Sequence, residues 1–506
     1  MKNIRKSICF FLALLLLLSI VSACKSPADE GKPSGSGTSE PPNGSAGSET
    51  GDTSPALDEN GYEKDSIPES TDFGGETFNI LSWAENNDYL FPEKPSENDI
   101  ISYDIYMRNN LIEETYHCTL KPEIVPGAWA NKEAFLGKAR MAGAYNYDLI
   151  ASYSLWPTVL AQEDLLANLL TLNYPEVTKP WWSTCSETYT YNNALYYLTC
   201  PSSRGSIMNA EVMFANVRLL ENYAPDEDVF SLVLEGKWTY SKFLEISENF
   251  KGLANDESEE NRIYALTVDD ESRMDAFYYA AGFHSVARNT DGSMSLGFTS
   301  RNELEQISDY AGSLVELFRD NNGFVVYLDD NITDMIKGRS AFSVSVLVNI
   351  SRLPDNSSYA PIPLPKYKQE DTRYYSCQTN AYDVWCIPKA TAKAEEAGII
   401  VEAIASSDYR SIFPKFYENK LKLKYSDDLV GYQIFDIIRD SIITDFGRLE
   451  QLSLNECGIE GIWRRIFVPS NSYYGNFMSS YNNMNGDGQL EVALEKLLAT
   501  YRNGNS

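Results

Sequence analysis

The run Tyr147-Asp148-Leu149-Ile150-Ala151 has the length and the apolar character of a buried β-strand. It follows Asn131 to Ala144, where the spacing of apolar residues favours a helix. A helix that leads directly into a buried strand is typical of α/β proteins, in which helices cover the faces of a largely parallel sheet. This part of the chain therefore predicts an α/β fold.

The same alternation continues on both sides of this strand. Toward the N-terminus, Thr77 to Leu81 predicts a strand, Ile101 to Tyr116 a helix, and Cys118 to Val125 a second strand. After residue 210 the pattern begins again. There we expect strands at 263–268, 294–298 and 341–348, and helices at 240–250 (capped by Thr239), 302–318 and 392–405. Two α/β lobes with several chain crossings fit this order better than two consecutive domains.

The first 24 residues have the features of an export signal. Lys2, Arg5 and Lys6 form a positive start, and an apolar run follows that is too short to span a bilayer comfortably. Val21-Ser22-Ala23-Cys24 resembles a lipobox, which implies that residues 1–23 are a signal peptide and that Cys24 is lipidated. Two acyl chains give a stable anchor, because each buried CH₂ contributes ~0.8 kcal/mol. The alternative is an ordinary secretory signal with an incidental cysteine.

Residues 24–71 are rich in Gly, Ser, Pro, Thr and Glu and contain almost no apolar side chains. Such a segment cannot bury enough surface to offset the entropy of ordering it, so we expect a disordered tether. Its typical reach is roughly 35–40 Å. Together with the signal, this predicts a body that is lipid-anchored on the extracellular face of the cell membrane.

The chain is strongly acidic, with 72 Asp and Glu against 42 Lys and Arg and a net charge of −30. Loss of the three positive charges of the signal would take this to −33. A surface of this charge argues against nucleic acid as a partner, and against membrane contact other than through the lipid.

The sequence offers no recognisable catalytic or metal-binding motif. Only His117 and His284 are present, the cysteines show no CxxC spacing, and GxSxG, Walker and HExxH motifs are missing. Asn485-Gly486-Asp487-Gly488 suggests a calcium loop, but Leu494 then occupies the position that requires a bidentate Glu. We therefore expect a turn there, no metal, no cofactor and no enzyme activity.

Six cysteines lie outside the signal, and pairing among them is possible outside the cell. They are Cys118, Cys185, Cys200, Cys377, Cys386 and Cys457. Cys185 and Cys200 are placed symmetrically about Asn192-Asn193. If these two asparagines form a hairpin turn, the cysteines face each other and can form a disulfide; a helix after Trp182 is the alternative.

Several short segments, in this order and spacing, resemble the extracellular solute-binding proteins of ABC importers, in the carbohydrate-binding group that includes maltose-binding protein. The similarity covers nearly all of 72–506. The segments that carry it are Tyr147 to Ile150 with Leu165 to Leu169, Pro180 to Trp182, Ala194 to Leu198, Phe214 to Leu220, Gly236 to Tyr240, Met335 to Phe342, Pro363 to Tyr367 and Trp385 to Lys389. Ser407 to Asp440 resembles a long-chain subgroup that is common among lipoproteins.

The resemblance implies a two-lobed periplasmic-binding-protein-like fold of type II, with a hinge and a ligand cleft between the lobes. It assigns 72–208 and 379–445 to the first lobe, and 209–378 and 446–506 to the second. Ligand would bind near the carboxyl ends of the strands and favour a closed arrangement of the lobes.

Placement at the cleft suggests ten ligand-binding residues, because aromatic planes cover the faces of a sugar while polar groups satisfy its hydroxyls. They are Trp83, Glu85, Asn86, Tyr153, Trp156, Arg204, Ser343, Ser345, Tyr382 and Trp385. We expect Trp83 and Trp385 to flank the ligand, with core packing or surface ion pairing as the alternative for each residue.

The function that this implies is a monomeric lipoprotein that captures a sugar or oligosaccharide and delivers it to the permease subunits of an ABC importer. A peptide or another polar solute is an alternative ligand. A sensory lipoprotein that presents its ligand to a membrane receptor kinase is an alternative role. An extracellular hydrolase is a further one, although glycoside hydrolysis requires two suitably spaced carboxylates that a sequence does not reveal.

Overall fold

A computed structural model describes residues 56–93, 95, 100–298, 300–319, 325–327, 331–354, 358–423, 429–454 and 458–503. The predicted signal peptide 1–23, the lipidation site Cys24, most of the predicted tether and Cys457 lie outside these residues. Within the described ranges, no helix combines the length and the apolar character needed to cross a membrane.

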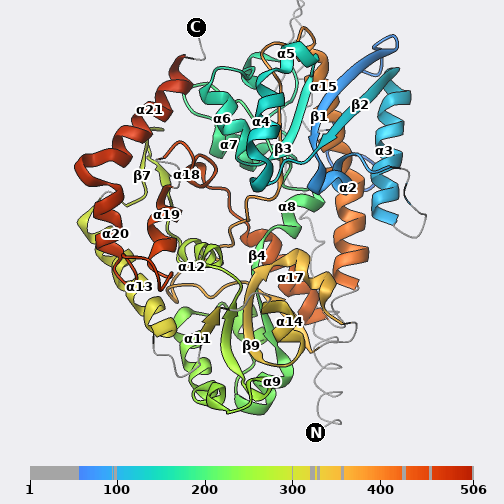
Figure 1. Ribbon diagram of the computed structural model, residues 1–506. Coiled ribbons are helices and arrows are strands. Elements are labelled where there is room, and N and C mark those ends of the chain that lie inside the picture. Colours follow the sequence, from blue (N-terminus) through green and yellow to red (C-terminus); the bar gives the residue numbers. More distant parts are fainter. Residues whose placement is uncertain are drawn as a thin grey trace, which may run out of the picture. The chain divides into compact units, whose positions relative to one another are not determined.

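The first lobe is built on a four-stranded sheet in the order β11-β3-β1-β2 (Figure 1). The central strand β1 runs parallel to β2 and β3, and β11 is antiparallel to β3. These strands are β1 (Glu76–Trp83), β2 (Cys118–Val125), β3 (Leu149–Tyr153) and β11 (Asp383–Cys386). The main helices here are α3 (Ile100–Tyr116), α4 (Lys132–Arg140), α6 (Trp156–Gln162), α7 (Ser183–Tyr189) and α15 (Ala394–Ser407).

The second lobe contains a five-stranded mixed sheet in the order β10-β4-β9-β5-β8. β5 is parallel to β8 and β9, whereas β4 is antiparallel to β9 and β10. The strands are β4 (Glu211–Asn216), β5 (Tyr264–Val268), β8 (Val325–Tyr327), β9 (Ser340–Val346) and β10 (Tyr359–Ile362). Its helices include α9 (Val217–Tyr223), α10 (Val229–Leu234), α11 (Tyr240–Ser247), α12 (Met274–Ala280), α13 (Arg301–Arg319) and α14 (Asn331–Ile336). The predicted two-lobed α/β fold is confirmed.

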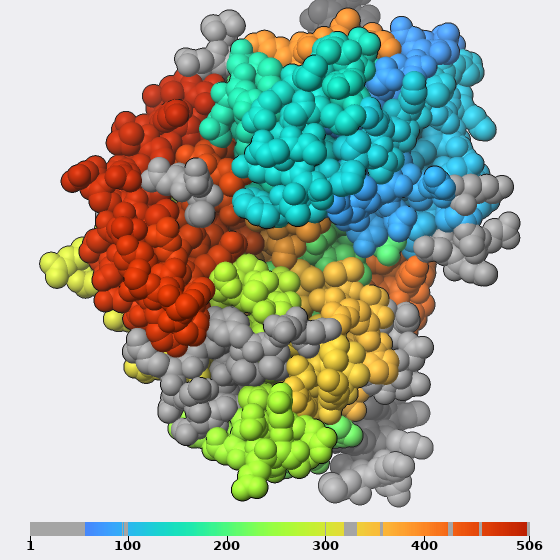
Figure 2. All heavy atoms as spheres, viewed as in Figure 1, coloured from blue at the N-terminus to red at the C-terminus, as the bar shows by residue number. Residues whose placement is uncertain are grey.

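Two segments cross between the sheets side by side. The backbone N–H of Glu211 donates to the carbonyl of Cys377, and that of Thr379 donates to Asn209, both at 2.9 Å. Figure 2 shows a recess between the blue and cyan first lobe and the yellow-green second lobe, where green and orange atoms of the crossing segments are exposed. A rotation of one lobe against the other would have to bend these segments.

Among the helices after β11, α17 (Leu429–Ser441) departs from the predicted lobe boundaries, and α21 (Gln489–Asn503) contacts elements of both lobes. α17 packs against β10 and α10, so it lies with the second sheet although the prediction placed 379–445 in the first lobe. α19 (Gly458–Arg465) packs on α12, and α20 (Phe477–Met484) on α13. α21 contacts α6 of the first lobe and β7 (Met294–Leu296), which forms a hairpin with β6 (Val286–Arg288).

Local sequence signals account well for individual elements. Thr239 caps α11, accepting a hydrogen bond from the N–H of Lys242 at 3.3 Å. The predicted helix 131–144 is interrupted at Met141, between α4 and α5 (Ala142–Tyr145). β3 begins at Leu149 rather than Tyr147 and extends to Tyr153, because its pairing with β11 continues to that residue.

Residues 56–71, which the composition assigns to the tether, contact the first lobe. Glu63 pairs with Lys179 at 2.9 Å, and Asp65 pairs with Arg410 at 2.9 Å. The ring of Tyr62 meets Tyr409 edge-on at 5.4 Å. The polar residues of this segment therefore form ion pairs with the first lobe, and the part of the predicted tether from residue 56 to residue 71 is packed against it.

The predicted disulfide between Cys185 and Cys200 is wrong, although the predicted turn is right. Asn192 and Asn193 both have positive φ, and Tyr191 and Ala194 pair across them. The ladder stops there because Cys185 lies in the helix α7. Its thiol donates to the carbonyls of Trp182 and Thr199 at 3.0 and 2.9 Å, and both cysteines are free and buried.

Candidate functional site

Four aromatic rings form a continuous row in the first lobe. Tyr153 meets Trp83 edge-on at 5.5 Å and stacks on Trp156 at 4.9 Å. Trp156 in turn stacks on Trp129 at 5.9 Å. Trp83 and Trp156 are almost fully buried, whereas Trp129 is 57% exposed. The row therefore leads from the core of the lobe to a solvent-exposed indole.

The topology of the sheet explains why these rings meet. β1 ends at Trp83, β3 ends at Tyr153, and Trp129 follows the end of β2 in the short helix η2 (Trp129–Asn131). Because β1, β2 and β3 are parallel, their carboxyl ends share one edge of the sheet. Open α/β sheets bind ligands outside this edge.

Polar groups fix the loops around the aromatic row. The indole of Trp156 donates to the carbonyl of Gly127 at 2.6 Å, and the N–H of Gly127 donates to the carboxylate of Glu85 at 3.0 Å. The amide of Asn86 donates to Asp383 at 3.2 Å. Glu85 and Asn86 therefore hold the loops after β1 and β2, and Glu85 is exposed at the surface.

Asp383 lies behind this row at the start of β11. Its Oδ1 accepts hydrogen bonds from the indole of Trp83 at 2.7 Å and from Asn86 at 3.2 Å. Burial raises the pKa of Asp383 to about 7, against the opposing effect of these two hydrogen bonds. The carboxyl is therefore a buried acceptor that carries little charge in mildly acidic solution.

Largely buried ion pairs lie in the second lobe and in the C-terminal segment that packs on it. Arg273 pairs with Glu211, the first residue of β4, at 2.8 Å and with Asp269, which follows β5, at 2.7 Å. Asp275 accepts from both Arg448 and Arg464. Each of these arginines has a carboxylate partner, so their charges are largely neutralised.

Tyr153 connects the two surfaces. Burial raises the pKa of its hydroxyl to about 12, and the positive charges of Arg448 and Arg464 oppose that increase. Both arginines belong to the C-terminal segment, which packs on α12 of the second lobe. The aromatic row of the first lobe and the ion pairs of the second therefore lie within electrostatic range of each other.

Four of the predicted ligand-binding residues lie inside the protein, apart from the aromatic row. Ser343 and Ser345 are fully buried in β9; Ser343 accepts from the hydroxyl of Thr267 at 3.1 Å, and Ser345 from the amide of Asn349 at 2.8 Å. Tyr382 is 6% exposed and its hydroxyl lies 3.5 Å from that of Tyr189. Trp385 packs edge-on against Phe91 at 6.2 Å.

Arg204 lies at the start of α8 (Arg204–Met208), directly before the crossing into the second lobe. Its guanidinium carbon is 4.3 Å from the centroid of the Tyr89 ring and 5.4 Å from that of Phe416. Tyr89 belongs to α2 (Asn87–Leu90), which follows the loop of Glu85 and Asn86. Arg204 is therefore beside the same loop as the aromatic row.

Sequence reasoning missed Trp129 and Asp383. Trp129 lies just after β2, as Glu85 lies just after β1. The predicted end of the second strand at Val125 was therefore a signal that could have identified Trp129 as a candidate. Asp383 offered no comparable signal, because its role depends on Trp83 at the opposite end of the first-lobe sequence.

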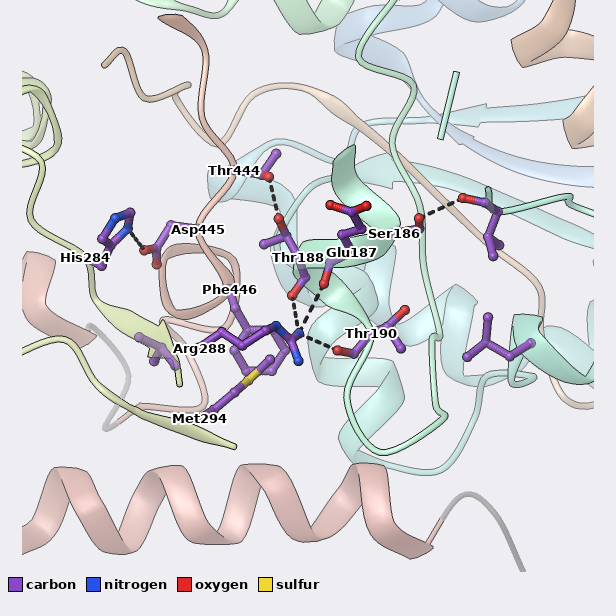
Figure 3. A pocket seen from close by; sticks show the side chains of 13 residues that line it. Ser186, Glu187, Thr188, Thr190, His284, Arg288, Met294, Thr444, Asp445 and Phe446 are labelled. Carbon is purple, nitrogen blue, oxygen red and sulfur yellow. Dashed lines mark hydrogen bonds and ion pairs between the residues drawn. The ribbon is translucent and has the colours of Figure 1, made fainter. Parts of the chain in front are cut away.

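A separate pocket of about 710 Å³ lies between α7 and the β6–β7 hairpin (Figure 3). None of the ten predicted residues lines it. Arg288 reaches across and donates to the carbonyls of Glu187, Thr188 and Thr190 at 3.1, 3.3 and 2.5 Å. These bonds satisfy carbonyls at the C-terminal end of α7. The positive charge of a guanidinium also interacts favourably with the negative end of the helix dipole there.

His284 and Asp445 form a further polar contact of this pocket, at 3.2 Å. The hydrogen bond to Asp445 raises the pKa of His284. Asp445 also accepts from the N–H of Ser285 and caps α18 (Phe446–Leu449) through the N–H of Arg448. The polar groups of the pocket thus join segments of both lobes and of the C-terminal region. No group of side chains suited to a metal ion occurs in the described part of the chain.

Comparison with known proteins gives a match in structure only. No protein-family model matches the chain, and no curated protein matches it in sequence. Among solved structures, an ABC transporter solute-binding protein from Thermotoga lettingae, bound with alpha-D-tagatose, matches with a TM-score of 0.50. The match covers 84% of this chain and 100% of that chain at 18% sequence identity. At this identity the similarity concerns the fold, which is that of periplasmic solute-binding proteins.

Proposed function

We propose that this protein binds a sugar or oligosaccharide in the cleft between its lobes and delivers it to the permease subunits of an ABC importer. In this role it is a binding protein without enzyme activity, works as a monomer and needs no cofactor. The observation that carries the proposal is the row of stacked rings that ends in the exposed Trp129.

A sugar suits this surface better than a purely apolar solute. An exposed indole backed by Trp156 and Tyr153 is a rigid platform for the C–H face of a pyranose or furanose ring. The partly exposed side chains of Arg273, Asp269 and Arg464 offer donors and acceptors for hydroxyl groups on the side of the second lobe. The fold similarity to a tagatose-bound protein agrees with this choice of ligand class.

Binding is expected to close the lobes about the paired crossing segments near Asn209 and Thr379. A ligand shifts such an equilibrium only by its greater affinity for the closed state. Contacts with both Trp129 and the ion pairs of the second lobe would supply that difference, because they can be made simultaneously only when the lobes approach.

A thermal-shift screen of mono- and oligosaccharides, followed by titration calorimetry, tests this proposal. A ligand at 100 times its Kd adds ~2.7 kcal/mol to the free energy of unfolding. For a ligand found this way, Trp129→Ala should weaken binding by at least ~1 kcal/mol while the melting temperature changes little, since the ring is largely exposed. The control is Tyr145→Ala, because this exposed ring precedes the amino end of β3, at the opposite edge of the sheet from the row. Failure of every sugar to bind would overturn the proposal.

We also propose that Cys24 is lipidated and holds the protein at the extracellular face of the cell membrane through residues 24–55. The support is the Val21 to Cys24 sequence after a short apolar run. In the native host, Cys24→Ala should yield unprocessed or shed protein. A variant that still fractionates with membranes as a mature, lipidated form would contradict this.

A further inference from the structure

Arg204 differs from the other arginines near the cleft in its partners. Arg273, Arg448 and Arg464 each pair with a carboxylate. Arg108, which reaches the end of α2 on the same loop, pairs with Asp408. Arg204 forms no such ion pair with the described residues, and its Nε is buried without a hydrogen-bond partner there.

Aromatic rings hold the Arg204 guanidinium in place. Tyr89 and Phe416 lie 4.3 and 5.4 Å from its central carbon, so the guanidinium is oriented without a carboxylate. A side chain that is held by stacking keeps its planar fork of donors available for another acceptor. An unpaired donor that is shielded from water is costly, and an incoming acceptor would remove that cost.

Two further features connect this group to the cleft. Gly205 packs so closely on Asp383 that an added Cβ would lie 2.5 Å from Oδ2, which places the start of α8 against the carboxyl that binds Trp83. Asn87, two residues before Tyr89, has a buried side-chain oxygen without a partner among the described residues. The Nε of Arg204 in α8 and the Oδ1 of Asn87 in α2 are therefore each unsatisfied among the described residues.

We propose that Arg204 binds the carboxylate of an acidic sugar, so that the ligand of the cleft is a uronic acid or an oligosaccharide that contains one. A uronic acid carries the group that Arg204 lacks, a carboxylate that can accept from its guanidinium. The inference rests on the proposed function, because it assigns a ligand class to the same cleft. Arg204 then supplies the positive charge that the paired arginines of the second lobe do not.

Calorimetric titration with galacturonate, glucuronate and their short oligosaccharides, compared with galactose, glucose and the matching neutral oligosaccharides, tests this inference. We expect at least tenfold tighter binding of the acidic member of a pair, with an affinity that falls as salt is added. Arg204→Gln should remove most of this difference, and Arg204→Lys should retain part of it because the charge remains. Arg301→Gln, which removes an exposed charge from α13, should leave the preference unchanged.

The outcomes separate this inference from the proposed function. If neutral sugars bind as tightly as acidic ones, and Arg204→Gln does not change the ratio of the two affinities, the inference of an acidic ligand is overturned. Sugar binding itself, and with it the proposed function, would stand. Binding of neither kind of sugar would overturn the proposed function and the inference with it. Circular dichroism and the melting temperature of each variant establish that a loss of binding does not come from unfolding.

Discussion

The indole nitrogen of Trp83 donates a 2.7 Å hydrogen bond to the carboxylate of Asp383, 300 residues further along the chain. Trp83 ends β1, and Asp383 begins β11, which the intervening β3 separates from β1 in the sheet. The bond therefore spans a central strand and connects the N-terminal part of the first lobe with the segment that returns from the second. Both side chains are buried, so this contact belongs to the framework that supports the aromatic row.

Loss of this hydrogen bond should destabilise the protein measurably. Trp83→Phe keeps most of the ring but removes the donor, and we expect a loss of roughly 1–3 kcal/mol in the free energy of unfolding. Trp83→Ala should cost ~3–5 kcal/mol, as for a large buried aromatic side chain. Urea denaturation measures both. Trp385→Phe, at a buried ring on Phe91, is the control and should cost less than Trp83→Phe; an equal cost would mean that the hydrogen bond contributes nothing.

The pKa of Asp383 should make stability depend on pH. Burial raises this pKa to about 7 in the folded protein, against ~3.9 in the unfolded chain. The folded state therefore favours the protonated carboxyl, and its stabilising contribution is complete below pH ~4 and lost as the pH rises to about 7. Since a difference of one pKa unit corresponds to about 1.36 kcal/mol, the free energy of unfolding decreases by at most ~4 kcal/mol over this range.

Asp383→Asn tests this pH dependence, since the amide keeps an acceptor oxygen without a titrating group. Urea denaturation at a series of pH values from acidic to neutral measures the free energy of unfolding of both proteins. This free energy should decrease less with rising pH in the variant than in the wild type. Glu402 and Glu460 also have pKa values raised to about 7 by burial, so a residual slope is expected. Identical slopes for the two proteins would show that Asp383 does not titrate in this range.

His284 should produce a dependence on pH in a different range. Its hydrogen bond with Asp445 raises the pKa of the imidazole above 6.5 in the folded protein. The pair therefore stabilises the fold fully below pH ~6.5, and this contribution disappears as the pH rises through the folded pKa. In thermal denaturation, His284→Gln should be less stable than the wild type in mildly acidic solution, and the difference should shrink in mildly alkaline solution. His117→Gln, at the more exposed histidine, is the control.

The buried cysteines should behave as unreactive thiols. Cys118, Cys185, Cys200, Cys377 and Cys386 are free and buried, and burial raises the pKa of the Cys185 thiol to about 12. An Ellman titration should therefore detect almost no reaction of these thiols in the native protein and rapid reaction after denaturation. Dithiothreitol should not change the melting temperature. A decrease in melting temperature on reduction would indicate a disulfide.

Features that depend on neighbours in the chain could be predicted from the amino-acid sequence. The apolar runs predicted β1, β2 and β9 to within a few residues, Thr239 marked the start of α11, and Asn192-Asn193 formed the expected turn. Each follows from backbone preferences or from the periodicity of apolar residues within a short window. The order of these elements was sufficient to predict two α/β lobes.

Which side chains face the cleft could be learned only from the folded protein. Trp83 ends β1 and Trp129 follows β2, two parallel strands of one sheet, yet Trp83 is 1% exposed and Trp129 is 57% exposed. β1 lies between two strands, whereas β2 is at the edge of the sheet. The bond of Trp83 to Asp383, and the lack of a carboxylate partner for Arg204 among the described residues, depend on which distant segments meet there. Burial and pairing are properties of contacts between residues far apart in the chain, and a local pattern carries no record of them.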